Sequence, residues 1–345
     1  MKFRNLIIIL FLFVTWAIVL SEFFDAGKRD DKGRKNINKE GLSEGHKSKK
    51  TIWSTGFEKV GIPLDHDTVK QKAWYYKSTS DTPQPLIVSL HTWSGDYMQE
   101  DTLALMARTA NMNYIHPDFR GPNRTFDACC SDLAIKDIDA AIDYAIENGP
   151  VDTTKIYVTG TSGGGYATLV MFMRSRHNIR KFSAWVPISD LVAWYSESKI
   201  RGNRYARDIL ECTGTDSTRL DEDEAKKRSP LHMETPGSGR VGAELKIYCG
   251  VFDGLQGSVP ITQSINFYNK LLSDLGATDS TVFVTAAEKV WLLERRRPLP
   301  GVSAAIGGRG VCLQKQYQNI QLTVFEGGHE MLEEWGFGEL VSLTH

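Results

Sequence analysis

The sequence predicts an α/β protein with a mostly parallel central sheet and helices on both faces. Three observations predict this class. Short runs rich in β-branched residues alternate with longer segments of helical periodicity. The run 86–90 is apolar at nearly every position, as expected when both faces of a strand are covered. Segment 155–173 places a strand-like run, a glycine-rich turn and an apolar helix in succession.

Length and composition indicate an ordinary globular chain. The 345 residues are 41% hydrophobic and 24% charged, which is enough for one large domain. The formal net charge of −1 gives no reason to expect a nucleic-acid partner. The five cysteines show no C-x-x-C spacing, so neither a metal site nor a disulfide framework is predicted.

The amino-terminal segment has the features of an export signal. Lys2 and Arg4 precede an apolar run at 6–20, which has the length of a signal-peptide core. We therefore interpret 1–24 as a signal peptide or, alternatively, an uncleaved membrane anchor that tethers the protein. Residues 25–50 are polar and charged, which predicts a disordered linker. The expected product is an exported catalytic domain at 51–345, periplasmic or secreted.

The elements of this domain follow from periodicity and turn signals. Strands are expected at 73–76, 86–90, 113–115, 156–159, 182–188, 245–249, 281–285 and 321–325. Helices are expected at 99–110, 133–147, 166–173, 261–275 and 290–297, with a closing helix after residue 329. Segment 191–234 interrupts the alternation and is long, charged and aromatic, which predicts an inserted lid.

The turn at 160–164 carries the strongest chemical signal. It reads Gly-Thr-Ser-Gly-Gly, a G-x-S-x-G match between a predicted strand and a predicted helix. In this context the serine is held in a strained turn with its hydroxyl exposed at the strand end. We predict Ser162 as a nucleophile and the amide of Gly163, at the helix start, as an oxyanion donor.

Two further residues complete a catalytic set. Asp253 and His329 come just after the predicted strands 245–249 and 321–325. The carboxyl ends of parallel strands meet at one edge of a sheet, so both residues are expected near Ser162. An imidazole activates the serine, and a carboxylate fixes the imidazole. Asp190 also follows a predicted strand and is the alternative acid.

The second oxyanion donor is expected after strand 86–90. The turn at 91–95 follows this strand directly, and the amide of Trp93 is the favoured donor, with Thr92 as the alternative. The remaining histidines that we considered lie in segments without a partner pattern and are interpreted as structural: His66, His116, His177 and His232.

Five short motifs resemble those of a known enzyme family. In chain order they are His91-Thr92-Trp93-Ser94, Phe119-Arg120-Gly121, the 160–165 turn, Gly250-Val251-Phe252-Asp253 with Val259-Pro260, and Gly328-His329-Glu330. Together they resemble the catalytic domain of the prolyl oligopeptidase family. The resemblance implies an α/β-hydrolase fold, a Ser162/Asp253/His329 triad and no cofactor. The chain leaves no room for the amino-terminal β-propeller of many members, and 254–258 and 278–320 are longer than usual.

These features predict an exported serine hydrolase that cleaves a peptide, amide or ester bond through an acyl-enzyme, with a prolyl-oligopeptidase-like peptidase favoured. The alternatives are a carboxylesterase acting on acylated glycans or small esters, and an inactive hydrolase fold that serves as a binding protein. The substrate is expected to be a small molecule, a peptide or an acylated glycan, and the oligomeric state stays open. Candidate substrate-binding residues are Trp93, Arg120, Trp194, Tyr195, Arg201 and Arg204.

The cysteines leave one question open. Cys129 and Cys130 precede the 133–147 helix, and Cys212 lies in the predicted lid. In an exported protein one of the first two is expected to form a disulfide with Cys212. The alternative is that all these cysteines are buried free thiols.

Overall fold

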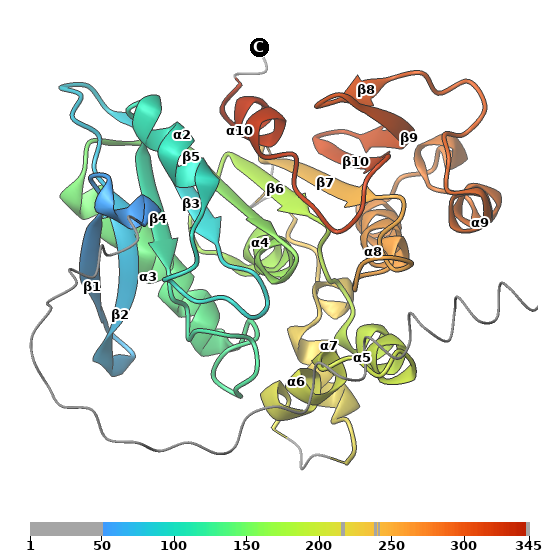
Figure 1. Ribbon diagram of the computed structural model, residues 1–345, viewed down its shortest axis with the longest axis horizontal. Helices are drawn as coiled ribbons and strands as arrows, with labels where there is room; N and C mark the ends of the chain where they lie inside the picture. Colours follow the sequence, from blue (N-terminus) through green and yellow to red (C-terminus); the bar gives the residue numbers. More distant parts are fainter. Residues whose placement is uncertain (1–50, 215–217, 238–239, 241, 343–345) are drawn as a thin grey trace, which may run out of the picture. The chain divides into compact units, whose positions relative to one another are not determined.

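A ten-stranded sheet with the strand order β1-β2-β4-β3-β5-β6-β7-β10-β9-β8 runs through the protein (Figure 1). The computed structural model describes residues 51–342 except 215–217, 238–239 and 241. These residues pack as one unit. The predicted segments 1–24 and 25–50 lie outside the described residues. In the described part of the chain, no helix has the length and apolar character needed to cross a membrane.

The strands are β1 Glu58–Leu64, β2 Asp67–Tyr76, β3 Gln84–Leu90, β4 Asn113–Pro117, β5 Val151–Thr161, β6 Lys181–Trp185, β7 Glu244–Gly250, β8 Ala305–Ile306, β9 Arg309–Tyr317 and β10 Ile320–Phe325. The helices are α2 Thr102–Thr109, α3 Asp132–Asn148, α4 Gly163–Arg174, α5 Leu191–Ile200, α6 Tyr205–Cys212, α7 Glu222–Arg228, α8 Ile261–Asp274, α9 Ala286–Arg295 and α10 Glu333–Val341, with 3₁₀ turns at η2 Ile52–Ser54, η3 Pro230–His232 and η5 Ser280–Val282.

The centre of the sheet is parallel. Strands β4, β3, β5, β6, β7 and β10 pair in parallel, whereas β1 and β2 at one edge and β9 and β8 at the other pair antiparallel. Alternate residues of a central strand enter different cores: Leu86 and Val88 belong to one apolar cluster and Ile87 to another. Both faces of the strand are therefore buried, which confirms the predicted α/β class.

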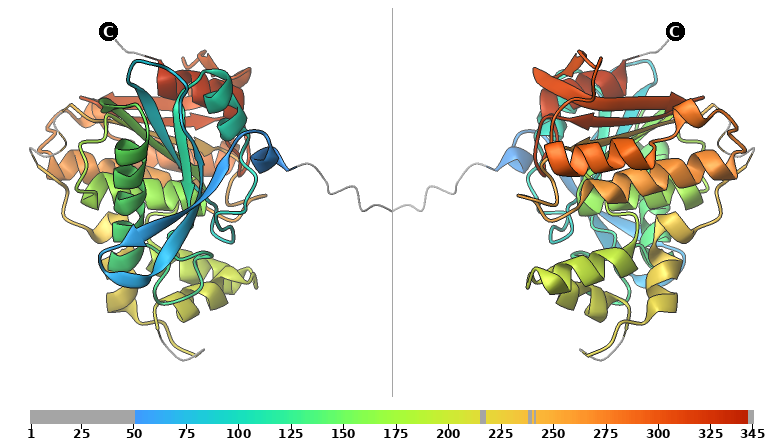
Figure 2. Two further views of the ribbon diagram at one scale, coloured as in Figure 1. Left: turned by 90° about the vertical axis from the view of Figure 1, so that its left-hand side faces the viewer. Right: turned by 90° about the vertical axis from the view of Figure 1, so that its right-hand side faces the viewer.

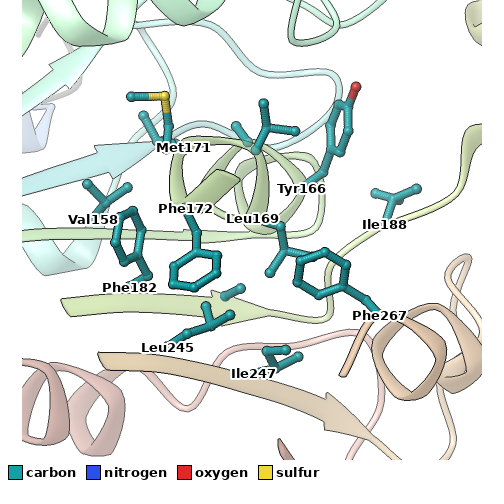
Figure 3. Packing of buried hydrophobic residues seen from close by; sticks show 14 of the residues in the cluster. Val158, Tyr166, Leu169, Met171, Phe172, Phe182, Ile188, Leu245, Ile247 and Phe267 are labelled. Atoms are coloured by element: carbon teal, nitrogen blue, oxygen red, sulfur yellow. The ribbon is translucent and has the colours of Figure 1, made fainter. Parts of the chain in front are cut away.

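Helices cover the two faces of the sheet (Figure 2). Helices α3, α4 and α8 pack on one face, and α2 and α10 contact each other on the opposite face. Figure 3 shows the first core, where Leu169 and Phe172 of α4 pack near Phe182 and Leu245 of the strands. Helix α3 begins within one residue of its predicted start, after Ser131, whose hydroxyl accepts a hydrogen bond from Ala134 N at 3.1 Å.

Several predicted elements are corrected. The strand at 281–285 is absent, because η5 occupies Ser280–Val282 and Thr285 forms a capping box with Glu288 at the start of α9. The strand at 182–188 stops at Trp185, and Val186 takes a left-handed φ of 43° that ends the strand. Strands β1 and β9 were not predicted. Each is stabilised by antiparallel pairing with the strand that follows it rather than by a strong local pattern.

The segment predicted as a lid is a helical insert. Helices α5, α6 and α7 and turn η3 lie together in this part of the chain (Figure 1). The indole of Trp194 is 1% exposed and belongs to the main core, so α5 is anchored to the domain through an aromatic side chain. We call 191–234 the helical insert below.

The cysteines are buried free thiols. Cys212 Sγ of the insert lies 2.8 Å from Cys129 Sγ. Of the two candidate partners of Cys212, the fold therefore places Cys129 next to it, with both thiols free. Burial raises the pKa of Cys212 and Cys130 well above the usual range, and that of Cys249 and Cys312 to about 12.

Thiol titration distinguishes the two cysteine hypotheses. We expect native protein to react slowly with a disulfide reagent such as dithionitrobenzoate at pH 8, because the reactive species is the exposed thiolate. In denaturant all five cysteines should react, which matches the five in the sequence. A count of three in denaturant without reductant, with peptide mapping that joins Cys129 to Cys212, would instead establish the disulfide.

Candidate active site

Four predicted site residues follow the carboxyl ends of parallel strands. Trp93 lies after β3, Ser162 after β5, Asp253 after β7 and His329 after β10. In the sheet order these strands are β3, β5, β7 and β10, with β6 between β5 and β7. Because the strands run parallel, these residues lie at the same edge of the sheet.

Ser162 occupies a strained turn. Its backbone has φ 58° and ψ −115°, outside the regions that L-residues favour, and its amide donates to Trp185 O at 2.9 Å. Helix α4 begins at the next residue. A Cβ atom on Gly160 would overlap the backbone of Gly164, so the strand can turn this sharply into the helix only with glycine there. This is the geometry expected of a G-x-S-x-G elbow.

The strain at Ser162 predicts a measurable stability difference. Ser162→Gly and Ser162→Ala both remove the hydroxyl, but only glycine adopts φ 58° without steric cost. Strain of this kind is worth about 1–3 kcal/mol, and the greater freedom of glycine in the unfolded chain offsets up to about 1 kcal/mol of it. We expect the Gly variant to be about 1 kcal/mol more stable than the Ala variant in urea unfolding. A Gly variant that is less stable than the Ala variant would show that the turn is not strained.

Asp253 and His329 are in direct contact. His329 Nδ1 lies 2.6 Å from Asp253 Oδ2. The other carboxylate oxygen accepts hydrogen bonds from Gly254 N at 2.8 Å and Val259 N at 3.1 Å. The Asp253 residue is 1% exposed, whereas the His329 side chain is 22% exposed. A buried, fully bonded carboxylate therefore holds an imidazole that remains accessible from solvent.

The alternative acid has a different role in this structure. Asp190 Oδ1 caps α5 by accepting from Val192 N at 2.9 Å and Ala193 N at 3.2 Å. It lies 3.6 Å from the Nε2 atom of His232 rather than beside His329. Of the two carboxylates considered, only Asp253 contacts His329.

Ser162 and His329 are not hydrogen-bonded to each other within the described part of the chain. Ser162 is 8% exposed at the start of α4. Contacts between nucleophile and base are commonly long in unliganded hydrolases and shorten when substrate binds. The loop that carries His329 is tied to the loop that carries Asp253 through the hydrogen bond from Phe252 N to Gly327 O, 2.9 Å long.

The two predicted oxyanion donors lie side by side. A Cβ atom on Gly163 would overlap Trp93 N, so the two backbones approach as closely as glycine allows. Trp93 N donates to no acceptor among the described residues, and the first amides of a helix have no intrahelical acceptor. The alternative donor, Thr92 N, already donates to Gln99 Oε1 at 3.1 Å. Of the three amides considered, those of Gly163 and Trp93 are therefore free of the contact that engages Thr92 N.

We call the loop at 91–95 the oxyanion loop. The side chain of its first residue, His91, anchors it to the neighbouring 118–119 segment. The imidazole is fully buried, stacks on Phe119 at 3.8 Å, and has its ring nitrogens 2.9 Å from Thr92 O and Asp118 O. Burial lowers the pKa of His91. Asn123 N donates to Trp93 O at 2.8 Å on the other side of the loop.

Arg120 is a correction among the predicted substrate-binding residues. Its guanidinium contacts Asp137 through Nε at 2.7 Å and Nη2 at 3.1 Å, and Asp67 through Nη1 at 2.7 Å. All three nitrogens therefore bind carboxylates on α3 and β2, and Arg120 fixes its own left-handed turn rather than facing a substrate.

Two aromatic candidates of the insert differ in their surroundings. The Trp194 indole is buried and donates to Ser258 O at 2.8 Å. Tyr195 lines a separate cavity of about 800 Å³ with Lys199, Arg219 and Asp221. The enclosed indole of Trp194 contradicts a direct contact with substrate. The substrate-binding role of Tyr195 stays a prediction.

The remaining candidates contact the two active-site loops. Arg201 donates to Gly257 O at 3.1 Å and to Gly254 O, in the 250–258 loop that carries Asp253. Arg204 donates to the Ser94 hydroxyl of the oxyanion loop. The Trp93 side chain is 2% exposed and packs against Trp194 and Tyr205, which contradicts its predicted contact with substrate.

Two residues that the sequence did not single out contact the same loops. Asp208 Oδ2 accepts from Trp93 Nε1 at 3.1 Å. Arg296, the residue that ends α9, donates to Val251 O at 2.6 Å and Asp253 O at 3.4 Å, which gives a structural role to part of the long 278–320 stretch. No local pattern marks either residue, because each acts on a loop more than 40 positions away.

Comparison with known families finds one match. Residues 102–289 match the model described as the prolyl oligopeptidase family, which is more than half of the chain. The matched range contains Ser162 and Asp253, begins after Trp93 and ends before His329. A comparison with curated protein sequences finds no match.

Solved structures share the fold. Oligopeptidase B from Leishmania major is 14% identical with a TM-score of 0.53, over 82% of this chain and 36% of that one. A Mycobacterium tuberculosis puromycin-hydrolyzing peptidase is 13% identical with a TM-score of 0.51, over 82% and 37%. Acylaminoacyl peptidase from Pyrococcus horikoshii is 18% identical with a TM-score of 0.51, over 64% and 36%. The aligned part is thus little more than a third of each of these proteins, and at these identities the likeness concerns the fold.

Proposed function

This chain belongs to the prolyl oligopeptidase family of serine hydrolases, and on that premise we propose that it is a serine peptidase with Ser162 as nucleophile, His329 as general base and Asp253 as the acid that orients the base. The observation that carries the proposal is the 2.6 Å contact between His329 Nδ1 and Asp253 Oδ2 at the sheet edge where the strained Ser162 turn also lies. These three residue types, in this chain order, are those of the α/β-hydrolase triad.

In this mechanism Ser162 Oγ attacks the carbonyl carbon of the substrate while His329 Nε2 accepts the hydroxyl proton. Asp253 fixes the tautomer that leaves Nε2 free and stabilises the imidazolium that forms. The two amides of Gly163 and Trp93 donate to the oxyanion, with the helix dipole of α4 adding to the positive potential there. His329 then protonates the leaving group, and water hydrolyses the acyl-enzyme by the reverse sequence.

We propose peptides as the substrate class because the family is one of peptidases. The ion pairs of Arg120 and the burial of Trp194 leave the specificity residues unassigned in this proposal, and the helical insert supports the active-site loops. Export likewise remains a proposal, supported by the apolar run at 6–20 behind two basic residues. The mass of the protein recovered from its native compartment would test it, since cleavage removes about 20 residues.

Fluorophosphonate labelling followed by a substrate panel tests the function. We expect one label per wild-type chain, mapped to Ser162 by peptide sequencing, and none on Ser162→Ala. The panel compares aminoacyl-naphthylamides with short nitrophenyl esters and acetylated sugars. A labelled protein that cleaves only the esters or sugars would replace the peptidase by a carboxylesterase. A folded wild-type protein that takes up no label would favour a binding protein on a hydrolase fold.

A further inference from the structure

The helical insert touches both loops that the proposed mechanism uses. Asp208, within α6, contacts Trp93 of the oxyanion loop, and Arg204, the residue before α6, contacts Ser94 of the same loop. Trp194 and Arg201, at α5, contact the loop that carries Asp253 through Ser258 O and Gly257 O. The insert is therefore placed to fix the relative position of the oxyanion donors and the acid.

The Trp93 indole is the point where these contacts meet. It is enclosed by aromatic rings: Trp194 at 4.7 Å and an interplanar angle of 78°, Tyr205 at 6.5 Å and Tyr166 at 6.1 Å between ring centroids. Its one polar atom, Nε1, donates to Asp208 Oδ2 at 3.1 Å. A buried indole N–H without an acceptor would be costly, so Asp208 determines which orientation of the indole is stable.

Asp208 itself is half-buried. Burial raises the pKa of its carboxyl, and the indole N–H and the neighbouring Arg204 act in the opposite direction. Its contact with Trp93 spans 115 positions of sequence and joins the insert to the oxyanion loop. The contact therefore links two segments that nothing in the local sequence holds together.

We propose that Asp208 is a positioning residue for the reaction: by holding the Trp93 indole it fixes the backbone amide of Trp93 at the oxyanion site. Oxyanion donors act only within a narrow distance of the developing charge, and small displacements lower the rate without weakening ground-state binding. The inference rests on the proposed function, since it concerns the same site, but it assigns a role to a residue outside the triad and its loops.

The test measures the rate of fluorophosphonate labelling and the kinetics of the best substrate in the panel. In Asp208→Leu we expect the labelling rate constant and kcat to fall about tenfold, less than the loss of a whole donor, with KM changed less than about twofold. Asp208→Asn keeps an acceptor oxygen and should stay within about threefold of wild type. Arg207→Gln, an exposed neighbour on α6 that pairs with Glu211, is the matched control and should change neither.

A double-mutant cycle keeps the proposal testable if Asp208→Leu folds poorly. Trp93→Phe deletes the same hydrogen bond from the other side and should lower kcat to a similar extent, and the double variant should show no further loss. Additive losses, or an Asp208→Leu variant with the kcat of the Arg207→Gln control, would overturn the positioning role. A wild-type protein without labelling would instead contradict the proposed function, so the two failures are distinguishable.

Discussion

Ser162→Ala is expected to lower kcat by about 10⁴- to 10⁶-fold while leaving the fold intact. The substitution removes the oxygen that forms the acyl-enzyme but keeps the Cβ atom, so the strained backbone of the turn is unchanged. The oxyanion amides of Gly163 and Trp93 remain, which leaves a residual rate above that of water. Stopped-flow and long-incubation assays with the preferred substrate would measure both rates.

The free energy of unfolding of the Ser162→Ala variant serves as the control. Ser162 Oγ makes no hydrogen bond within the described part of the chain, so the free energy of unfolding should stay within about 1 kcal/mol of wild type. A variant that is folded and nevertheless retains more than a tenth of the wild-type kcat would show that another residue is the nucleophile.

Asp253→Asn is expected to lower kcat by about 10⁴-fold. The Asp253 Oδ1 atom accepts the amides of Gly254 and Val259, so the asparagine side chain would keep its oxygen there and turn its NH₂ group toward His329. His329 Nδ1 would then have to accept a hydrogen bond, which places the proton on Nε2. In that tautomer the imidazole cannot accept the proton of the serine hydroxyl.

Asp190→Asn is the matched control for Asp253→Asn. Asparagine caps a helix about as well as aspartate, and the contact of Asp190 with His232 does not involve the triad. We expect kcat within about twofold of wild type for this control. If the two substitutions had reversed effects, Asp190 would be the acid and the contact between Asp253 and His329 would be structural. Circular dichroism and urea unfolding of both variants would confirm that each is folded.

Local patterns predicted most of the fold. Strands with continuous apolar runs, such as 86–90 and 245–249, appear within a residue or two of their predicted bounds, because a strand buried on both faces leaves a clear signal. Strand β9 was missed because it lies next to a Gly/Pro-rich stretch and is stabilised by its antiparallel pairing with β10. The strand at 281–285 was wrong because its β-branched residues take part in turns and a helix cap.

The predicted site residues also fall into two groups: those that were chosen from strand ends and those that were chosen from residue type alone. Asp253 and His329, 76 positions apart, meet because each follows a parallel strand, and strand ends are visible in the sequence. The substrate-binding candidates Arg120, Trp194 and Tyr195 were chosen by residue type within a segment. Side-chain direction decides what such residues contact, and the structure directs them to ion pairs, to the core and to a separate cavity.

The sequence by itself determined the alternation of the central strands with helices and the turn that carries Ser162, because both depend on neighbouring residues. Only the tertiary structure decided which carboxylate lies beside His329, why Thr92 N is already engaged, and how Asp208 reaches Trp93. The physical reason is that hydrogen bonds and ring contacts between distant segments depend on packing in three dimensions, which leaves no periodic trace along the chain.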